Sequence, residues 1–157
     1  LEGIKTNVIR PFNVYGPGMQ ENDYRVLPNF ASQIKKGKSL KIYGSGNQTR
    51  TFCYVTDAIQ GFLRVITTGI PGEPYNIGNV SPEISIMDLV KKIKEISENP
   101  INYDVIDYPD SYPADEPNRR APDIKKAKVQ LGYVPKVSLD EGLKRFLKWT
   151  DANYSSS

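Results

Sequence analysis

The start of the chain constrains the fold most, because it places a short strand where no helix precedes it. Residues 4–9 (Ile-Lys-Thr-Asn-Val-Ile) are rich in β-branched side chains, and Pro11 stops the run. Parallel strands of one sheet are normally connected through a crossover helix. We therefore expect an α/β fold and expect that residues 1–157 begin part-way through it.

The remaining sequence alternates between short strand-like runs and amphipathic helices, which also indicates the α/β class. Strands are predicted over residues 39–43, 51–55, 74–77 and 101–106. Helices are predicted over 25–36, from a cap at Thr56 or Asp57 to 67, over 85–96, from a cap at Asp123 to 132, and from 138 onward.

Two of these helices have clear start signals, because Ser85 and Ser138 are each followed three residues later by an acidic residue. Residues 108–122 contain four prolines and are predicted to be irregular. Residues 153–157 are predicted to be a frayed polar tail.

Composition excludes several classes of protein. Hydrophobic residues make up 38% of the 157 residues and charged residues 25%, which describes a globular domain. No apolar run approaches the length of a membrane span, so no membrane partner is predicted. The net charge of +3 is mild, and the basic residues fall on amphipathic segments such as 91–94 and 125–128. We interpret those segments as solvated helix faces and predict no nucleic-acid partner.

The sequence contains no histidine and one cysteine, Cys53. A Ser-His-Asp or Cys-His catalytic group and a histidine-containing zinc site are therefore excluded within these residues, and no metal site is predicted. A single cysteine allows no intrachain disulfide, which favours a reducing compartment and a cytoplasmic location.

Gly44-Ser-Gly46 follows a predicted strand and suggests a dinucleotide-binding fingerprint. The third glycine of that fingerprint is replaced by Thr49, and the next predicted element is another strand. A dinucleotide fingerprint needs a helix N-terminus at that point to hold the pyrophosphate. We therefore predict a turn here, and no cofactor site.

Several segments carry more information together than alone. They are Arg10-Pro-Phe-Asn-Val-Tyr-Gly-Pro17, Arg25-Val-Leu-Pro28, Leu40-Lys-Ile-Tyr-Gly-Ser-Gly-Asn-Gln-Thr-Arg50, Tyr54-Val-Thr-Asp57, Tyr75-Asn-Ile-Gly78 and Arg120-Ala-Pro-Asp-Ile-Lys-Lys-Ala-Lys128. In this order they resemble the NAD-dependent epimerase/dehydratase family of extended short-chain dehydrogenases. The resemblance is nearest to UDP-glucuronate decarboxylases, followed by dTDP-glucose 4,6-dehydratases and 4-epimerases.

This resemblance implies the C-terminal portion of an extended Rossmann fold, with the last strands of the parallel sheet and a small mixed α/β substrate domain. Residues 1–20 would complete the sheet. Residues 21–157 would form most of the substrate-binding domain, with returns to the sheet near 51–78.

The resemblance also implies that the chain contacts a nucleoside diphosphate sugar. Arginine forks suit a diphosphate, because guanidinium can donate two parallel charge-assisted hydrogen bonds. The matching residues are Arg50 and Arg120; Arg119 and Arg120 could equally be a solvated pair.

Further positions match the sugar, the base and the cofactor. Asn13 and Asn76 match substrate-contacting asparagines, and Arg25 with Val26 matches a position near the sugar, where arginine could pair with a sugar carboxylate. Lys41, Ile42 and Tyr43 match the edge that receives the base, and Val14 and Tyr15 lie where the family places the nicotinamide of NAD.

Two family features are missing from residues 1–157. No glycine-rich dinucleotide fingerprint occurs, and none of the ten tyrosines has a lysine four residues later. We therefore expect no catalytic residue in this chain, expect NAD to be bound mainly by an N-terminal Rossmann portion, and predict that the isolated chain is inactive. A homodimer is expected at full length.

The reaction stays open between decarboxylation, dehydration and epimerisation. The rival hypotheses are a non-catalytic nucleotide-sugar binding module and an interaction domain that has lost the ligand.

Overall fold

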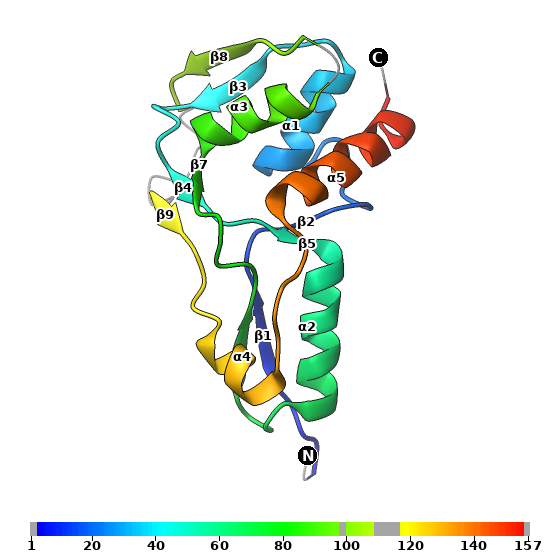
Figure 1. Cartoon of the computed structure of the whole chain (residues 1–157), viewed down its shortest axis with the longest axis vertical. Coiled ribbons are helices and arrows are strands. Elements are labelled where there is room, and N and C mark those ends of the chain that lie inside the picture. Colours follow the sequence, from blue (N-terminus) through cyan, green and yellow to red (C-terminus); the bar gives the residue numbers. More distant parts are fainter. Residues whose placement is uncertain (1–2, 98–99, 109–116, 156–157) are drawn as a thin grey trace.

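The computed structural model describes residues 3–97, 100–108 and 117–155, and the molecule is elongated, with two packed regions one above the other (Figure 1). The elements in chain order are β1 (Val8–Pro11), β2 (Val14–Tyr15), α1 (Val26–Lys35), β3 (Leu40–Tyr43), β4 (Thr49–Arg50), β5 (Cys53–Tyr54), α2 (Val55–Thr68), β6 (Pro74–Ile77), β7 (Ile84–Ser85), α3 (Ile86–Ile96), β8 (Tyr103–Ile106), β9 (Arg119–Arg120), α4 (Lys125–Leu131) and α5 (Leu139–Asn153). Among the described residues, no helix is long and apolar enough to cross a membrane.

The lower region of Figure 1 consists of β1, α2, β6 and α4. Strands β1 and β6 pair in parallel, with Val8 opposite Pro74 and Pro11 opposite Ile77. The core of this region joins buried side chains of β6, α2 and α4 with Tyr133, which is fully buried. Gly61 of α2 allows close packing here, because a Cβ at this position would lie 2.6 Å from the Ile77 side chain.

The first strand is displaced from its predicted position. We predicted residues 4–9 ended by Pro11, but β1 runs from Val8 to Pro11 and residues 4–6 are exposed. Pairing with β6 sets this register: the Val8 and Phe12 N–H groups donate to Glu73 and Ile77. Pro11 falls between these donors, where its missing N–H costs no bond to β6.

The upper region consists of α1, β3, α3, β8 and α5 (Figure 1). Strands β3 and β8 pair in parallel, α1 packs against β3, and α5 packs against α1 and α3. The core of this region includes Phe30, Leu40 and Phe146. Both predicted serine caps are confirmed: Ser85 accepts from the Asp88 N–H at 3.0 Å and Ser138 from the Glu141 N–H at 3.2 Å.

Three short strands lie at the edge of the molecule, where the two regions meet. β7, β4 and β9 form a mixed sheet in that order, while β2 pairs in parallel with β5. The strand predicted over 51–55 is shorter than expected: only Cys53 and Tyr54 form β5, and Val55 is already the first residue of α2. The residues just before it, Thr49 and Arg50, form the separate strand β4, which pairs with β7 and β9.

Two predictions were wrong, one for the N-cap of α2 and one for the C-terminal tail. In both cases a contact with a residue distant in sequence determines the observed structure. Asp57 does not cap α2, whose N-cap is Tyr54; its buried carboxylate accepts the N–H groups of Lys136 and Val137 at 2.9 and 2.8 Å. The tail is not frayed at Tyr154, which is buried and donates from its hydroxyl to the Met19 carbonyl at 3.0 Å.

The start of α4 also differs from its prediction. This helix begins at Lys125, with Ile124 as N-cap, and Asp123 precedes the cap. Asp123 still accepts the Lys125 N–H, at 2.8 Å, so it supports the first turn. Gly132 ends the helix as predicted, in the left-handed region at φ +62°.

Candidate functional site

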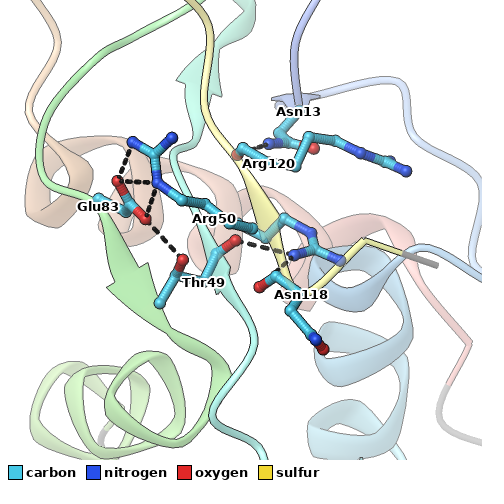
Figure 2. A network of polar contacts seen from close by, with 7 residues as sticks. Asn13, Thr49, Arg50, Glu83, Asn118 and Arg120 are labelled. Carbon is cyan, nitrogen blue, oxygen red and sulfur yellow. Dashed lines mark hydrogen bonds and ion pairs between the residues drawn. The ribbon is translucent and has the colours of Figure 1, made fainter.

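The sheet β7–β4–β9 brings together the two arginines predicted to bind a diphosphate. Arg50 of β4 is the Cα partner of Arg120 of β9, and Thr49 is the partner of Arg119. Side chains alternate between the two faces of a strand, so partners in register share a face. Figure 2 shows the Arg50 and Arg120 side chains extending to one side of the sheet, while Glu83 lies on the other.

Arg50 is held in place from within the sheet. Its side chain is buried, with the residue 7% exposed, and Nη1 donates to the carbonyls of Thr49 at 2.8 Å and Asn118 at 3.4 Å. Both acceptors are backbone carbonyls, so these two bonds fix the orientation of the guanidinium. Arg120 beside it is exposed. This side of the sheet, with Arg50 and Arg120, is called the arginine face below.

Asn13 fixes the backbone around the arginine face. Its side-chain N–H donates to the Thr51 carbonyl at 2.7 Å and to the Arg120 carbonyl at 3.3 Å. Asn13 has φ +44°, a conformation that asparagine adopts more readily than most residues. One side chain from the corner between β1 and β2 therefore holds the residue after β4 and the last residue of β9.

On the opposite side of the sheet, the Glu83 carboxylate accepts hydrogen bonds from two side chains. Arg119 donates from Nε to both oxygens of Glu83, at 2.9 and 3.1 Å, and from Nη2 at 2.7 Å. The Thr49 hydroxyl donates to the same carboxylate at 2.6 Å. The bonds from Arg119, followed by that from Thr49, hold the pKa of Glu83 below its ordinary value. We call this side, with Thr49, Glu83 and Arg119, the ion-pair face.

A second group of predicted residues surrounds an open hollow of about 420 Å³ beside β2. Its lining comprises Val14, Tyr15, Gly16, Pro17, Gly18, Met19, Gln20, Asp23, Arg25 and Val55. Arg25 is paired with Asp23, which accepts from its Nε at 3.0 Å and from its Nη2. Val26, the first residue of α1, is half-buried directly after Arg25. The structure thus places the predicted nicotinamide-side residues and the predicted sugar-side arginine in one hollow.

Tyr15 reaches this hollow only with part of its surface. The residue is 3% exposed, packs edge-on against Phe52, Tyr54 and Phe146, and donates from its hydroxyl to the Leu139 carbonyl at 3.4 Å. Burial raises the pKa of its hydroxyl well above the ordinary value. Tyr15 is therefore a neutral core residue that can offer a ligand a ring edge and backbone.

The predicted base-binding segment lies on β3. Ile42 is fully buried, Lys41 is exposed, and Tyr43 stacks on Tyr108 with ring centroids 6.0 Å apart. A hollow of about 340 Å³ adjoins this stack and is lined by Ser45, Asn47, Gln48, Tyr108 and Asn118. Asn118 also accepts the Arg50 bond, so this hollow lies directly beside the Arg50 side chain.

Asn76 is placed apart from these groups. It belongs to β6 in the lower region, where its side chain donates to the Asp123 carbonyl at 3.0 Å. This bond ties β6 to the start of α4, three residues after Arg120. Asn76 therefore stabilises the segment that follows Arg120 in the chain, and it does not lie on the arginine face.

The sequence did not indicate three residues that complete the site: Asp23, Glu83 and Asn118. Asp23 had a usable signal, because an acidic residue two positions before a helix N-cap can accept the cap's N–H, as it does for Arg25 at 2.9 Å. Glu83 and Asn118 had none, since their partners lie 36 and 68 residues away.

The chain is similar in sequence to known proteins. The family model described as "NAD dependent epimerase/dehydratase family" matches residues 1–78. UDP-glucuronic acid decarboxylase 6 of Arabidopsis thaliana is 40% identical over 141 residues, which cover 90% of this chain and 39% of that protein. UDP-glucuronic acid decarboxylase 1 of Xenopus tropicalis is 39% identical over 148 residues, covering 94% of this chain and 34% of that protein.

The chain belongs to the NAD-dependent epimerase/dehydratase family. It spans about 40% or less of the length of these relatives. The resemblance stated from the motifs is confirmed.

Solved structures of the epimerase/dehydratase family agree in fold. UDP-glucuronic acid 4-epimerase of Bacillus cereus, in complex with UDP-glucuronic acid and NAD, matches with a TM-score of 0.82 and 33% identity over 93% of this chain and 45% of that one. A dTDP-glucose 4,6-dehydratase of Bacillus anthracis, in complex with NAD, matches with a TM-score of 0.80 and 25% identity over 94% of this chain and 45% of that one. The predicted extended Rossmann fold class is confirmed.

Residues Gly44–Gly46 form a turn, as predicted. Both glycines have positive φ, and the chain continues into β4. The helix N-terminus with which a dinucleotide fingerprint holds the pyrophosphate does not follow here. Among residues 3–97, 100–108 and 117–155, no group of three or more histidine, cysteine or acidic side chains is arranged to hold a metal ion.

Proposed function

We propose that the arginine face holds the diphosphate of a nucleotide sugar. The observation that carries this proposal is the register: Arg50 and Arg120 are Cα partners on neighbouring parallel strands and share one face. Two guanidinium groups on one face can each donate two N–H bonds to phosphate oxygens. Arg50 is pre-oriented by its bonds to backbone carbonyls, so less conformational freedom is lost on binding.

The sugar and the base would then lie to the two sides of the diphosphate. The hollow beside β2 has a volume in the range of ligand sites, and Arg25 at its rim offers a partner for a sugar carboxylate. The hollow beside Tyr43 and Tyr108 adjoins Arg50 and suits a flat base, as proposed for Lys41, Ile42 and Tyr43. Asn13 and Asn76 would contact the substrate or brace the segments that do.

We favour decarboxylation of UDP-glucuronate as the reaction of the whole protein. Two observations support it: the relatives named as UDP-glucuronic acid decarboxylases are about 40% identical, and Arg25 provides a cation for a carboxylate. A 4-epimerase or a 4,6-dehydratase is the alternative, since solved structures of both kinds share the fold.

NAD is the proposed cofactor, and the described residues fit only one edge of it. Val14 and Tyr15 line the hollow, whereas the glycine-rich turn after β3 leads to another strand, β4, and does not form a dinucleotide fingerprint. NAD would supply hydride transfer at the sugar. Because residues 1–157 lack a tyrosine with a lysine four positions later, we propose that the isolated chain has no turnover with NAD and UDP-glucuronate.

The lower region supports a further Rossmann portion as partner. Among the described residues β1 pairs only with β6, and α2 exposes Ile59, Leu63 and Ile66, which lie on one side of the helix at i, i+4 and i+7. Parallel sheets are normally covered on both faces and extended by more strands. We propose that an N-terminal Rossmann portion packs here and that the full protein is a homodimer. We also propose a cytoplasmic location, which the single cysteine of residues 1–157 favours.

Calorimetry with UDP and with uridine tests the diphosphate site on the complete gene product. The proposal predicts that UDP binds far more tightly than uridine, and that Arg50→Lys narrows this gap by about tenfold, because lysine keeps the charge but loses the fork. Equal affinities for UDP and uridine in the unaltered protein would exclude the diphosphate site, and binding of neither would favour a scaffold without ligand.

A further inference from the structure

The rim of the hollow beside β2 carries one paired anion and cation, Asp23 and Arg25. We propose that Asp23 is a positioning residue that holds Arg25 as a fork for the carboxylate of a nucleotide-linked uronic acid. The site would thereby prefer uronic acids to neutral sugars. This inference rests on the proposed function, and it assigns the selectivity to a residue that need not touch the substrate.

The geometry of the pair leaves one edge of the guanidinium for a ligand. Asp23 accepts from Nε of Arg25 at 3.0 Å through both oxygens, and it also accepts from Nη2. The Arg25 side chain remains 55% exposed, whereas the Asp23 side chain is 13% exposed. Asp23 thus occupies the side edge, and the Nη1–Nη2 end stays accessible to a second carboxylate, which can accept two parallel bonds.

Both partners are anchored through the backbone. Arg25 is the N-cap of α1, and its own N–H donates to Asp23 Oδ1 at 2.9 Å. Helix α1 is fixed in turn by Leu27 and Phe30, which are buried in the upper core. The cation therefore projects from a rigid helix start rather than from a mobile loop.

The loop that carries Asp23 is tied down by the far end of the chain. The Tyr154 hydroxyl donates to the Met19 carbonyl at 3.0 Å, and the Ser155 N–H donates to Glu21 at 2.9 Å. Lys36 pairs with the other oxygen of Glu21 at 2.7 Å. The ends of α5 and α1 thus brace the loop on both sides, so the position of the Asp23 carboxylate is set by the fold.

Arg25 is the one cation and Asp23 the one anion among the described residues that line this hollow. The remaining lining consists of backbone, apolar side chains and Gln20. A ligand carboxylate entering here would meet a single recognition group. The orientation of that group then decides how well the carboxylate is bound.

Two opposing effects decide what Asp23 does to this binding. A negative charge near the ligand repels a carboxylate, which at a solvent-exposed site costs about threefold in affinity. An unheld arginine must be ordered on binding, which costs about tenfold. Ordering is the larger effect, so Asp23 should strengthen the preference for uronic acids although it carries the same charge as they do.

The test is calorimetry on the complete gene product with UDP, UDP-glucuronate and UDP-glucose as probes. The unaltered protein should bind UDP-glucuronate more tightly than UDP-glucose. Asp23→Asn should reduce this preference by about threefold, the net of the two effects, while the affinity for UDP itself stays within about twofold. Arg25→Gln should abolish the preference.

Asp151→Asn is the matched control, because Asp151 is an exposed carboxylate paired with Lys35 at 2.9 Å and does not line the hollow. It should leave the preference unchanged. A preference that rises or stays constant in Asp23→Asn would overturn the inference, as would an equal loss of affinity for all three probes. Failure of UDP to bind the unaltered protein would instead remove the proposed function on which the inference rests.

Discussion

The two faces of the sheet β7–β4–β9 both carry arginine, but the hydrogen bonds that hold these arginines differ. On the ion-pair face, Arg119 gives three hydrogen bonds to the carboxylate of Glu83. On the arginine face, Arg50 is oriented by neutral carbonyls, and Arg120 lies beside it. Arg119 and Arg120 are adjacent in sequence, so the alternation of a strand alone separates a structural arginine from a proposed ligand-binding one.

The comparison also shows why the arginine pair could not be resolved from sequence. A proline-rich segment with two adjacent arginines is compatible with a solvated pair or with two ligand contacts. The answer depends on β4 and β7, which lie 69 and 34 residues away from Arg119 respectively along the chain, counted from Arg50 and Ser85. Only the assembled sheet assigns one arginine to each face.

The largest effect should follow from removal of the buried arginine. Arg50→Ala should weaken UDP binding by about 100-fold, because two or more charge-assisted hydrogen bonds of about 1.5 kcal/mol each would be lost. Calorimetry measures this loss, and a thermal unfolding curve taken in parallel reports how far the fold is affected. A loss of UDP affinity below about threefold in a folded variant would contradict the assignment of Arg50.

The bracing role of Asn13 should give the next largest effect. Asn13→Ala removes the bonds to Thr51 and Arg120 and places alanine at φ +44°, so we expect about 2 kcal/mol lower unfolding stability. Asn13→Gly removes the same bonds but tolerates the backbone conformation, and it should cost about half as much. Urea unfolding of both variants checks this order, and an Asn13→Gly protein less stable than Asn13→Ala would refute it.

Local signals predicted those parts of the fold that depend on neighbouring residues. Ser85 and Ser138 cap their helices as their spacing indicated, and Gly132 ends α4 in the left-handed region. Contacts distant in sequence decided the rest. Asp57 had the sequence signature of a cap, yet the N–H groups of Lys136 and Val137 bind it.

The candidate site shows the same difference between local signals and contacts distant in sequence. Some of the residues that the motifs singled out come together, Arg50 with Arg120 and Arg25 with Val14 and Tyr15, whereas Asn76 lies apart on β6. The motifs did not predict the hydrogen-bond partners that hold these residues in place. These partners are Asp23 for Arg25, the Asn118 carbonyl for Arg50, and Tyr154 for the loop before Arg25. Supporting contacts of this kind depend on chain packing and leave no pattern in a short segment.

A small pH effect should be confined to the ion-pair face. Glu83 has a lowered pKa in the folded chain because of Arg119, so its contribution to stability is present at neutral pH. That contribution should be lost as the pH falls below the ordinary glutamate value of about 4.3 and through the lower folded pKa. Stability of the unaltered protein relative to Glu83→Gln, measured by urea unfolding between neutral and acidic pH, should therefore decline toward acid. A difference that grows toward acid would contradict this sign.

The most direct measurement compares two alanine variants at adjacent positions, Arg119→Ala and Arg120→Ala, by calorimetry with UDP on the complete gene product. The variants are matched in residue type, charge change and strand. Arg120→Ala should weaken UDP binding by about tenfold, the loss of one charge-assisted contact, whereas Arg119→Ala should change it by less than about twofold. Equal losses in the two variants, or a larger loss for Arg119→Ala, would contradict the claim that the arginine face binds the diphosphate.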